Sequence, residues 1–179
     1  MMKYPFLSLS LMSLPVVLAA AAPALAQITV SRAPAGAPDL GRMIAGSATT
    51  VLSVTAQGDV TRTSGNAIRL NGGSVTTPTI SISCAVQNAV DLCASHFLQV
   101  TIQPLGGRGP AAITMLRAGE LTGAVFRDGT PPAAPAMTFI LNPMGVGTAT
   151  FKLGMDVRLP AGAPSGPTFF DYSVTAVFL

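Results

Sequence analysis

A net charge of only +3 over 179 residues separates this chain from proteins that bind nucleic acid through a strong basic patch. Its ten lysine and arginine residues are interleaved with seven acids, whereas nucleic-acid recognition needs basic residues clustered on one face. Charged residues make up 9% of the chain, so Thr, Ser, Asn, Gln and the backbone must supply most of the polar surface. This composition is usual for an exported β-protein.

Residues 1–26 are predicted to be a secretory signal peptide. One basic residue precedes an apolar run from Phe6 to Ala22, and Ala24–Ala26 forms a small-x-small cleavage site. Pro15 and Pro23 interrupt the run, which argues against a transmembrane anchor of about 20 apolar residues. We therefore expect a mature chain that begins at Gln27, has no transmembrane span, and is exported to the periplasm, the cell surface or the extracellular space.

The mature chain is expected to form one domain after a short leading segment. Residues 27–38 combine an alternating strand, Gln27–Ser31, with a Pro/Ala/Gly-rich spacer, Arg32–Pro38, that is expected to run extended. Residues 39–179 form the predicted β-sandwich domain. A chain of about 150 residues can bury about 68–70% of its unfolded surface, so it needs no metal to build a core.

Short segments with alternating polarity follow one another along the mature chain and are separated by turn residues. No apolar stripe of helical period extends over three turns, so the pattern favours an all-β antiparallel sandwich or barrel of about ten strands. We favour the sandwich, with an Ig-like arrangement. Two weaker strands are expected on either side of a turn at Ala118–Glu120. The predicted strands are Gln27–Ser31, Thr49–Thr55, Val60–Thr63, Ala67–Leu70, Thr79–Val86, Phe97–Gln103, Ile113–Arg117, Leu121–Arg127, Met137–Leu141, Thr148–Leu159 and Thr168–Leu179.

Cys84 and Cys93 are the only two cysteines. In an oxidising compartment they are expected to form a disulfide, which would pin the base of a hairpin or a short surface helix. Two buried free thiols or a partial metal site are the alternatives. A zinc site would need at least three protein ligands, and His96 is the only histidine, so we expect no metal.

The closing strand has the clearest pattern in the chain. Five residues are expected to point into the core from one face, and Asp171, Ser173 and Thr175 fall on the other. A shift of one residue would bury Asp171, so the register of this strand is firmly set. The predicted core residues are Phe170, Tyr172, Val174, Ala176 and Phe178.

Catalytic and phosphate-binding patterns are weak. His96 with Asp91 and either Ser95 or Ser83 would be needed for a triad, and a single histidine beside a disulfide loop is more often a surface residue. Gly106–Gly109 lacks the Lys-Ser/Thr and the following helix of a phosphate-binding loop. We therefore predict no enzyme, no catalytic residues and no cofactor.

Three regions together resemble one known family. They are Ile28–Val30 with Asp39–Gly46, the Gly72-Gly73 turn, and the end of the chain from Phe151–Gly154 through Leu159–Gly162 and Gly166 to Tyr172–Val177. The chain resembles a family of exported bacterial proteins with a domain of unknown function, whose members look like pilin or adhesin subunits. The resemblance implies a pilin-like β-sandwich with no catalytic residues. The Cys84/Cys93 pair does not belong to the family pattern.

Two classes of function follow from these observations. The first is a non-enzymatic structural or surface-associated subunit, fimbrial or adhesin-like, that self-associates or joins other subunits through edge strands. Ile28 and Val30 would then form a candidate assembly strand, although pairing within its own sheet is favoured for this segment. The alternative is a binding module for a carbohydrate or peptide, which the absence of Trp disfavours.

Overall fold

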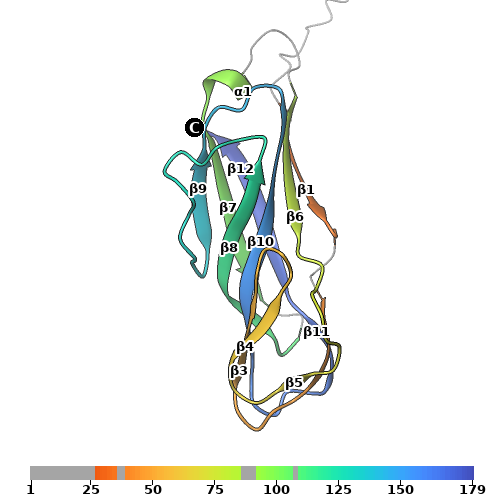
Figure 1. Cartoon of the computed structure of the whole chain (residues 1–179). Helices are drawn as coiled ribbons and strands as arrows, with labels where there is room; N and C mark the ends of the chain where they lie inside the picture. Colours follow the sequence, from red (N-terminus) through yellow and green to blue (C-terminus); the bar gives the residue numbers. More distant parts are fainter. Residues whose placement is uncertain (1–26, 36–38, 86–91, 107–108) are drawn as a thin grey trace, which may run out of the picture.

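The computed structural model of the chain describes residues 27–35, 39–85, 92–106 and 109–179. The predicted signal peptide therefore lies outside the described residues. The described residues form an elongated stack of antiparallel sheets, with one short helix at one end (Figure 1). The all-β, sandwich-like architecture predicted from the alternating segments is confirmed.

The largest sheet is built around the long strand β10. One edge of β10 pairs with β6 through Gly147–Lys152 and then with β3 through Met155–Leu159, while β8 follows its other edge. Two further strands complete the sheet, because β1 pairs with β6 and β4 pairs with β3. The bounds are β1 Gln27–Ala33, β3 Thr50–Val54, β4 Val60–Ser64, β6 Thr79–Ala85, β8 Ala112–Thr122 and β10 Gly147–Leu159.

The remaining strands of the described residues form two three-stranded sheets. One has the order β12-β7-β9 and the other β11-β2-β5. The chain passes from β11 to β12 at Phe170, so the predicted strand Thr168–Leu179 is divided between two sheets. The bounds are β2 Asp39–Ile44, β5 Ile68–Arg69, α1 Leu92–Ser95, β7 Leu98–Leu105, β9 Met137–Leu141, β11 Gly166–Phe169 and β12 Asp171–Phe178.

The core lies between the sheets and follows the period-2 pattern of the strands. Phe139 of β9 and Phe151 of β10 pack edge to face across the core with ring centroids 5.6 Å apart, and Phe126 packs on Phe139 in the same way at 5.2 Å. Each large side chain buried here contributes about 1.5–3 kcal/mol. The largest fully buried side chains are Tyr172, Phe151, Leu40, Ile80, Ile82, Ile102, Leu116, Leu141, Leu153, Met155, Val100 and Val157.

The residues predicted for the inward face at the end of the chain lie against the core. Phe170 and Tyr172 are buried, and Val174, Ala176 and Phe178 are partly buried against the core. Phe170 is the exception in position, because it lies at the junction that precedes β12 rather than within that strand.

The prediction of two weak strands on either side of a turn at Ala118–Glu120 was wrong. β8 runs without a turn from Ala112 to Thr122, because β10 offers hydrogen-bonding partners along most of that length. The turn-like residues at positions 119 and 120 fit into the strand through two local adjustments. The pairing with β10 shifts register beside Lys152, and Glu120 adopts a positive φ of 53°. The turn falls at Gly123 instead, where φ is 75° and an added Cβ would overlap the carbonyl oxygen of Thr148.

Candidate functional site

The candidate site is the place where two edge strands from different sheets meet. Within the described part of the chain, β1 pairs only with β6, and β12 pairs only with β7. β1 and β12 nevertheless lie against one another along one side of the sandwich. An edge strand leaves a row of backbone N–H and C=O groups without partners in its own sheet.

At alternate residues of β12, the backbone N–H and C=O groups point away from β7. Tyr172 lies opposite Pro104 of β7, which has no N–H to donate. The Tyr172 N–H donates instead to Asp171 Oδ1 at 2.8 Å, and its carbonyl oxygen accepts from Arg32 Nη1 at 2.7 Å. Because the direction alternates along an antiparallel strand, the backbone groups of Val174 and Ala176 also point to the free edge.

A groove of about 230 Å³ runs between the two strands. Its lining comes from both edges: Val30 and Arg32 of β1, Leu105 of β7, and Tyr172, Ser173 and Val174 of β12. Its walls therefore combine apolar side chains with backbone groups that can form hydrogen bonds. This combination suits an extended peptide segment.

Arg32 closes one end of the groove. Its guanidinium lies 3.1 Å from Asp171 Oδ1 and 5.1 Å from the centroid of the Tyr172 ring. Arg32 and Ala33 are the last residues of β1, so the prediction that Arg32 belongs to the spacer is wrong. The contact joins residues about 140 positions apart, so no local sequence pattern could have revealed it.

Tyr172 lines the groove but is itself fully buried, with the Arg32 guanidinium over its ring. Its hydroxyl is buried and has no hydrogen-bond partner among the described residues. Burial raises the pKa of Tyr172 to about 12, and the opposing effect of the Arg32 charge is smaller. The phenol therefore stays neutral at physiological pH, and the side chain serves packing rather than proton transfer.

The candidate assembly residues Ile28 and Val30 lie in β1. Both are half-buried against the core, and they stand opposite Cys84 and Ile82 of β6. The segment thus pairs within its own sheet, which is the arrangement that the sequence favoured. Exchange of this strand between copies stays a prediction.

The predicted disulfide between Cys84 and Cys93 is present. The two Cα atoms are 6.1 Å apart, and both cysteines are buried. The bond joins the end of β6 to the short helix α1, and the carbonyl oxygen of Cys93 accepts hydrogen bonds from the N–H groups of Met144 and Gly145. The disulfide therefore also anchors the turn that precedes β10.

The residues considered for catalysis are only partly together. Ser95 Oγ lies 2.8 Å from His96 Nδ1, whereas Ser83 is hydrogen-bonded to Thr148 in the ladder between β6 and β10. Asp91 lies outside the described residues. The described residues contain no group of three His, Cys, Asp or Glu side chains arranged to hold a metal ion. The absence of enzymatic activity stays a prediction.

The glycine-rich segment Gly106–Gly109 leads into a strand. Residues 107 and 108 lie outside the described residues, and the next element is β8 rather than a helix. A phosphate-binding loop depends on the N-terminus of a helix that follows it, so this segment lacks the required context.

Comparisons of the chain with known protein families, with curated proteins and with solved structures find no match. The resemblance to exported pilin-like or adhesin-like proteins therefore stays a prediction. In the described ranges, no helix has the length and apolar character needed to cross a membrane.

Proposed function

We propose that this chain is an exported, non-enzymatic structural or surface-associated subunit that associates through the free edges of β1 and β12. The observation that carries the proposal is the unpaired backbone of β12 beside an apolar groove. An extended segment from a neighbour can pair with such an edge through main-chain hydrogen bonds, and alternate side chains of that segment can enter the groove.

The geometry favours β12 as the accepting edge. The backbone groups of Val174 and Ala176 face outward, and Val30, Leu105 and Val174 supply the apolar lining of the groove. Arg32 already satisfies the carbonyl oxygen of Tyr172, so an added strand would pair beyond that point, towards Phe178. The segment β1 is the candidate donor within the same chain, since Ile28 and Val30 present apolar side chains at alternate positions.

The first test is the oligomeric state of the chain from Gln27, measured by size-exclusion chromatography with light scattering over a range of concentrations. We expect concentration-dependent oligomers from the wild-type chain. Ala176→Pro removes an N–H that points to the free edge and breaks no hydrogen bond with β7, so this variant should fold and stay monomeric. A wild-type chain that remains monomeric at every concentration would contradict self-association through these edges.

Two further variants sharpen the test. Ala176→Ser changes the same side chain but keeps the N–H, so it should associate like the wild-type chain. Deletion of Gln27–Ala33 distinguishes the donors: loss of oligomers identifies β1 as the linking strand, and persistence of oligomers assigns the association to the β12 edge alone. Equal association of the Pro and Ser variants would exclude the β12 edge.

A further inference from the structure

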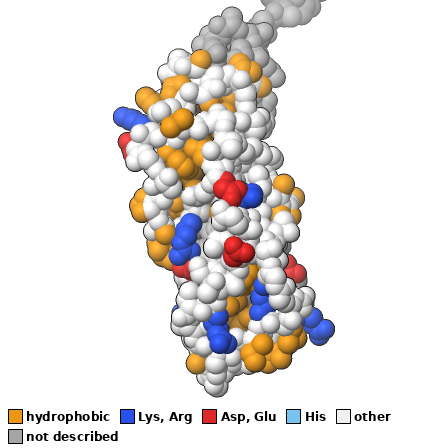
Figure 2. Space-filling model, viewed as in Figure 1, with side chains coloured by type: hydrophobic (Ala, Val, Ile, Leu, Met, Phe, Trp, Pro, Cys, Tyr) orange, Lys and Arg blue, Asp and Glu red, His pale blue; other side chains and the backbone are white. Residues whose placement is uncertain are grey.

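A second cavity lies at the end of the molecule opposite the disulfide, between the free edges of β4 and β5 (Figure 1). Its volume is about 380 Å³, within the range of small-ligand sites. Figure 2 shows basic side chains on both sides of hydrophobic atoms at this end of the molecule. The lining residues are Leu52, Val60, Arg62, Ala67, Ile68, Arg69, Asn71, Gly72 and Gly73.

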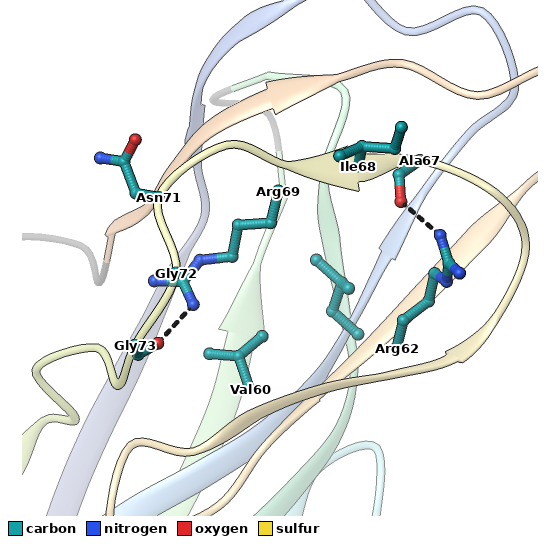
Figure 3. A pocket seen from close by; sticks show the side chains of 9 residues that line it. Val60, Arg62, Ala67, Ile68, Arg69, Asn71, Gly72 and Gly73 are labelled. Carbon is teal, nitrogen blue, oxygen red and sulfur yellow. Dashed lines mark hydrogen bonds between the residues drawn. The ribbon is translucent and has the colours of Figure 1, made fainter.

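Two arginines approach the cavity from opposite sides. Figure 3 shows Arg62 on one side and Arg69 on the other, with Val60 below Arg69 and the Arg69 guanidinium directed towards Gly73. Arg62 Nη1 donates to the carbonyl oxygen of Ala67 at 3.0 Å. Arg69 donates through Nε to the carbonyl oxygen of Leu40 at 2.8 Å and through Nη1 to that of Gly73 at 2.6 Å. These bonds hold both guanidinium groups in place and leave further N–H donors on each.

Neither charge is neutralised within the described part of the chain. The ion pairs there are Arg32–Asp171, Arg117–Asp156 and Lys152–Glu120, and all three lie outside the cavity. Asp39 lies in β2, next to β5, but its carboxylate accepts from the Gly41 N–H. Two positioned guanidinium groups without a carboxylate partner are a strong feature for binding an anion, because they match planar carboxylates in bidentate geometry.

We propose that this cavity binds a small organic dianion with a short apolar body, of the class of the aliphatic dicarboxylates. The two guanidinium groups would each take one carboxylate, and the apolar body would lie on the apolar lining residues Val60 and Leu52. A compact inorganic anion would leave this apolar floor uncovered. The ligand class therefore follows from the charges and the floor together.

The test is isothermal titration calorimetry of the chain from Gln27 with glutarate and adipate at low salt. Glutaramide, which is uncharged, and inorganic phosphate, which has no apolar body, are the comparison ligands. We expect saturable binding of at least one dicarboxylate, none of glutaramide, and phosphate binding that is at least about tenfold weaker. Absence of dicarboxylate binding, or phosphate binding of equal strength, would overturn the proposal.

Variants locate the site without depending on the two arginines alone. Gly72 lines the cavity, and an added Cβ there would meet no atom within 4 Å, so Gly72→Glu places a negative charge at the site without disturbing packing. Gly147→Glu is the matched control, since Gly147 is equally open and lies outside the cavity. We expect Gly72→Glu, Arg62→Gln and Arg69→Gln each to weaken binding at least about tenfold. An equal loss in Gly147→Glu, or unchanged binding in Gly72→Glu, would place the ligand elsewhere.

Discussion

Tyr172 is a buried polar side chain of the groove, and its burial affects both the stability of the fold and the pKa of its hydroxyl. Its ring is fully buried between the sheets and beneath the Arg32 guanidinium, yet its hydroxyl has no partner among the described residues. A buried hydroxyl that lacks a hydrogen bond costs about 1–3 kcal/mol. The contribution of Tyr172 to stability therefore comes from the ring.

We predict that Tyr172→Phe keeps the fold and raises the free energy of unfolding by about 1 kcal/mol, because it removes a buried polar group without a partner. Urea denaturation of the two chains measures the difference. A loss of stability of similar size would mean that the hydroxyl is stabilised in the fold, by the neighbouring Arg32 guanidinium or by a group outside the described residues.

The same residue gives the chain a specific dependence on alkaline pH. In the unfolded chain the phenol ionises near its ordinary pKa of about 10, while in the folded chain its pKa is raised to about 12. The unfolded state therefore binds fewer protons in this interval, and stability falls as pH rises from 10 to 12. Tyr172 is the only tyrosine from Gln27 onward and the chain has no Trp, so absorbance at 295 nm reports its ionisation directly. In Tyr172→Phe this part of the alkaline loss should disappear.

At the scale of one element, β10 contains two glycines with opposite roles. Gly154 is buried where β10 passes β3, and an added Cβ would lie 2.8 Å from the carbonyl oxygen of Val54 and 3.0 Å from the backbone nitrogen of Ala56. Gly147 begins the same strand and has open space around it. The absence of a side chain at position 154 lets the sheet close at this point.

We predict that Gly154→Ala lowers the free energy of unfolding by about 1–3 kcal/mol, because backbone atoms must move to make room. Gly147→Ala, the matched change in the same strand, should be neutral or raise stability by about 0.4–1 kcal/mol. Thermal unfolding followed by circular dichroism compares the two. Equal effects would show that close packing at Gly154 is not what decides the outcome.

Period-2 alternation predicted those elements whose two faces differ in polarity. It located β3, β6, β7, β9 and β10 closely, and the compartment argument predicted the disulfide. It missed β2, since Asp39–Ile44 has no clean alternation and is extended because β11 and β5 pair with it. It also divided β8, because the glycine and glutamate at positions 119 and 120 are typical of a turn and only the neighbouring β10 keeps them extended.

The candidate sites were harder to predict than the strands, because they depend on how strands of different sheets come together and local polarity does not indicate this. The groove depends on Arg32 reaching a carbonyl oxygen 140 residues away, and the second cavity depends on two edge strands meeting at one end of the molecule. Arg62 and Arg69 belong to different sheets, so only the folded chain brings them to one cavity. The Arg32 contact is too long-range to leave a local signature in the sequence, whereas Arg62 and Arg69 are close in sequence and only their membership of different sheets was hidden.

On the scale of the whole molecule, the disulfide and the arginine-lined cavity lie at opposite ends (Figure 1). The disulfide links β6 in the largest sheet to the helix that leads into β7 of another sheet. It therefore fastens two layers of the sandwich at one end, while the cavity depends on strand edges at the other.

We predict that replacing both cysteines, Cys84→Ala with Cys93→Ala, lowers the free energy of unfolding by about 2.7 kcal/mol, the value expected for closing a loop of about ten residues. The fold should persist at room temperature, because most of the core lies away from the bond. Urea denaturation in oxidising buffer measures the change, and wild-type protein in reducing buffer should match the variant. Unchanged stability would mean that the bond contributes nothing to folding.

Arg32 also affects how the free edge of β12 behaves before a partner binds. A free strand edge beside a groove with apolar lining can form main-chain hydrogen bonds with an extended segment of any other chain. A chain that pairs as far as Tyr172 must displace or enclose the guanidinium that binds the Tyr172 carbonyl oxygen and the Asp171 carboxylate, whereas a segment that pairs only from Val174 towards Phe178 leaves these contacts in place. Burying that charge without compensation is costly, so an indiscriminate chain is penalised while a segment that preserves the arginine's contacts is not. Arg32, near the end of β1, thus disfavours unspecific pairing at the free edge of β12.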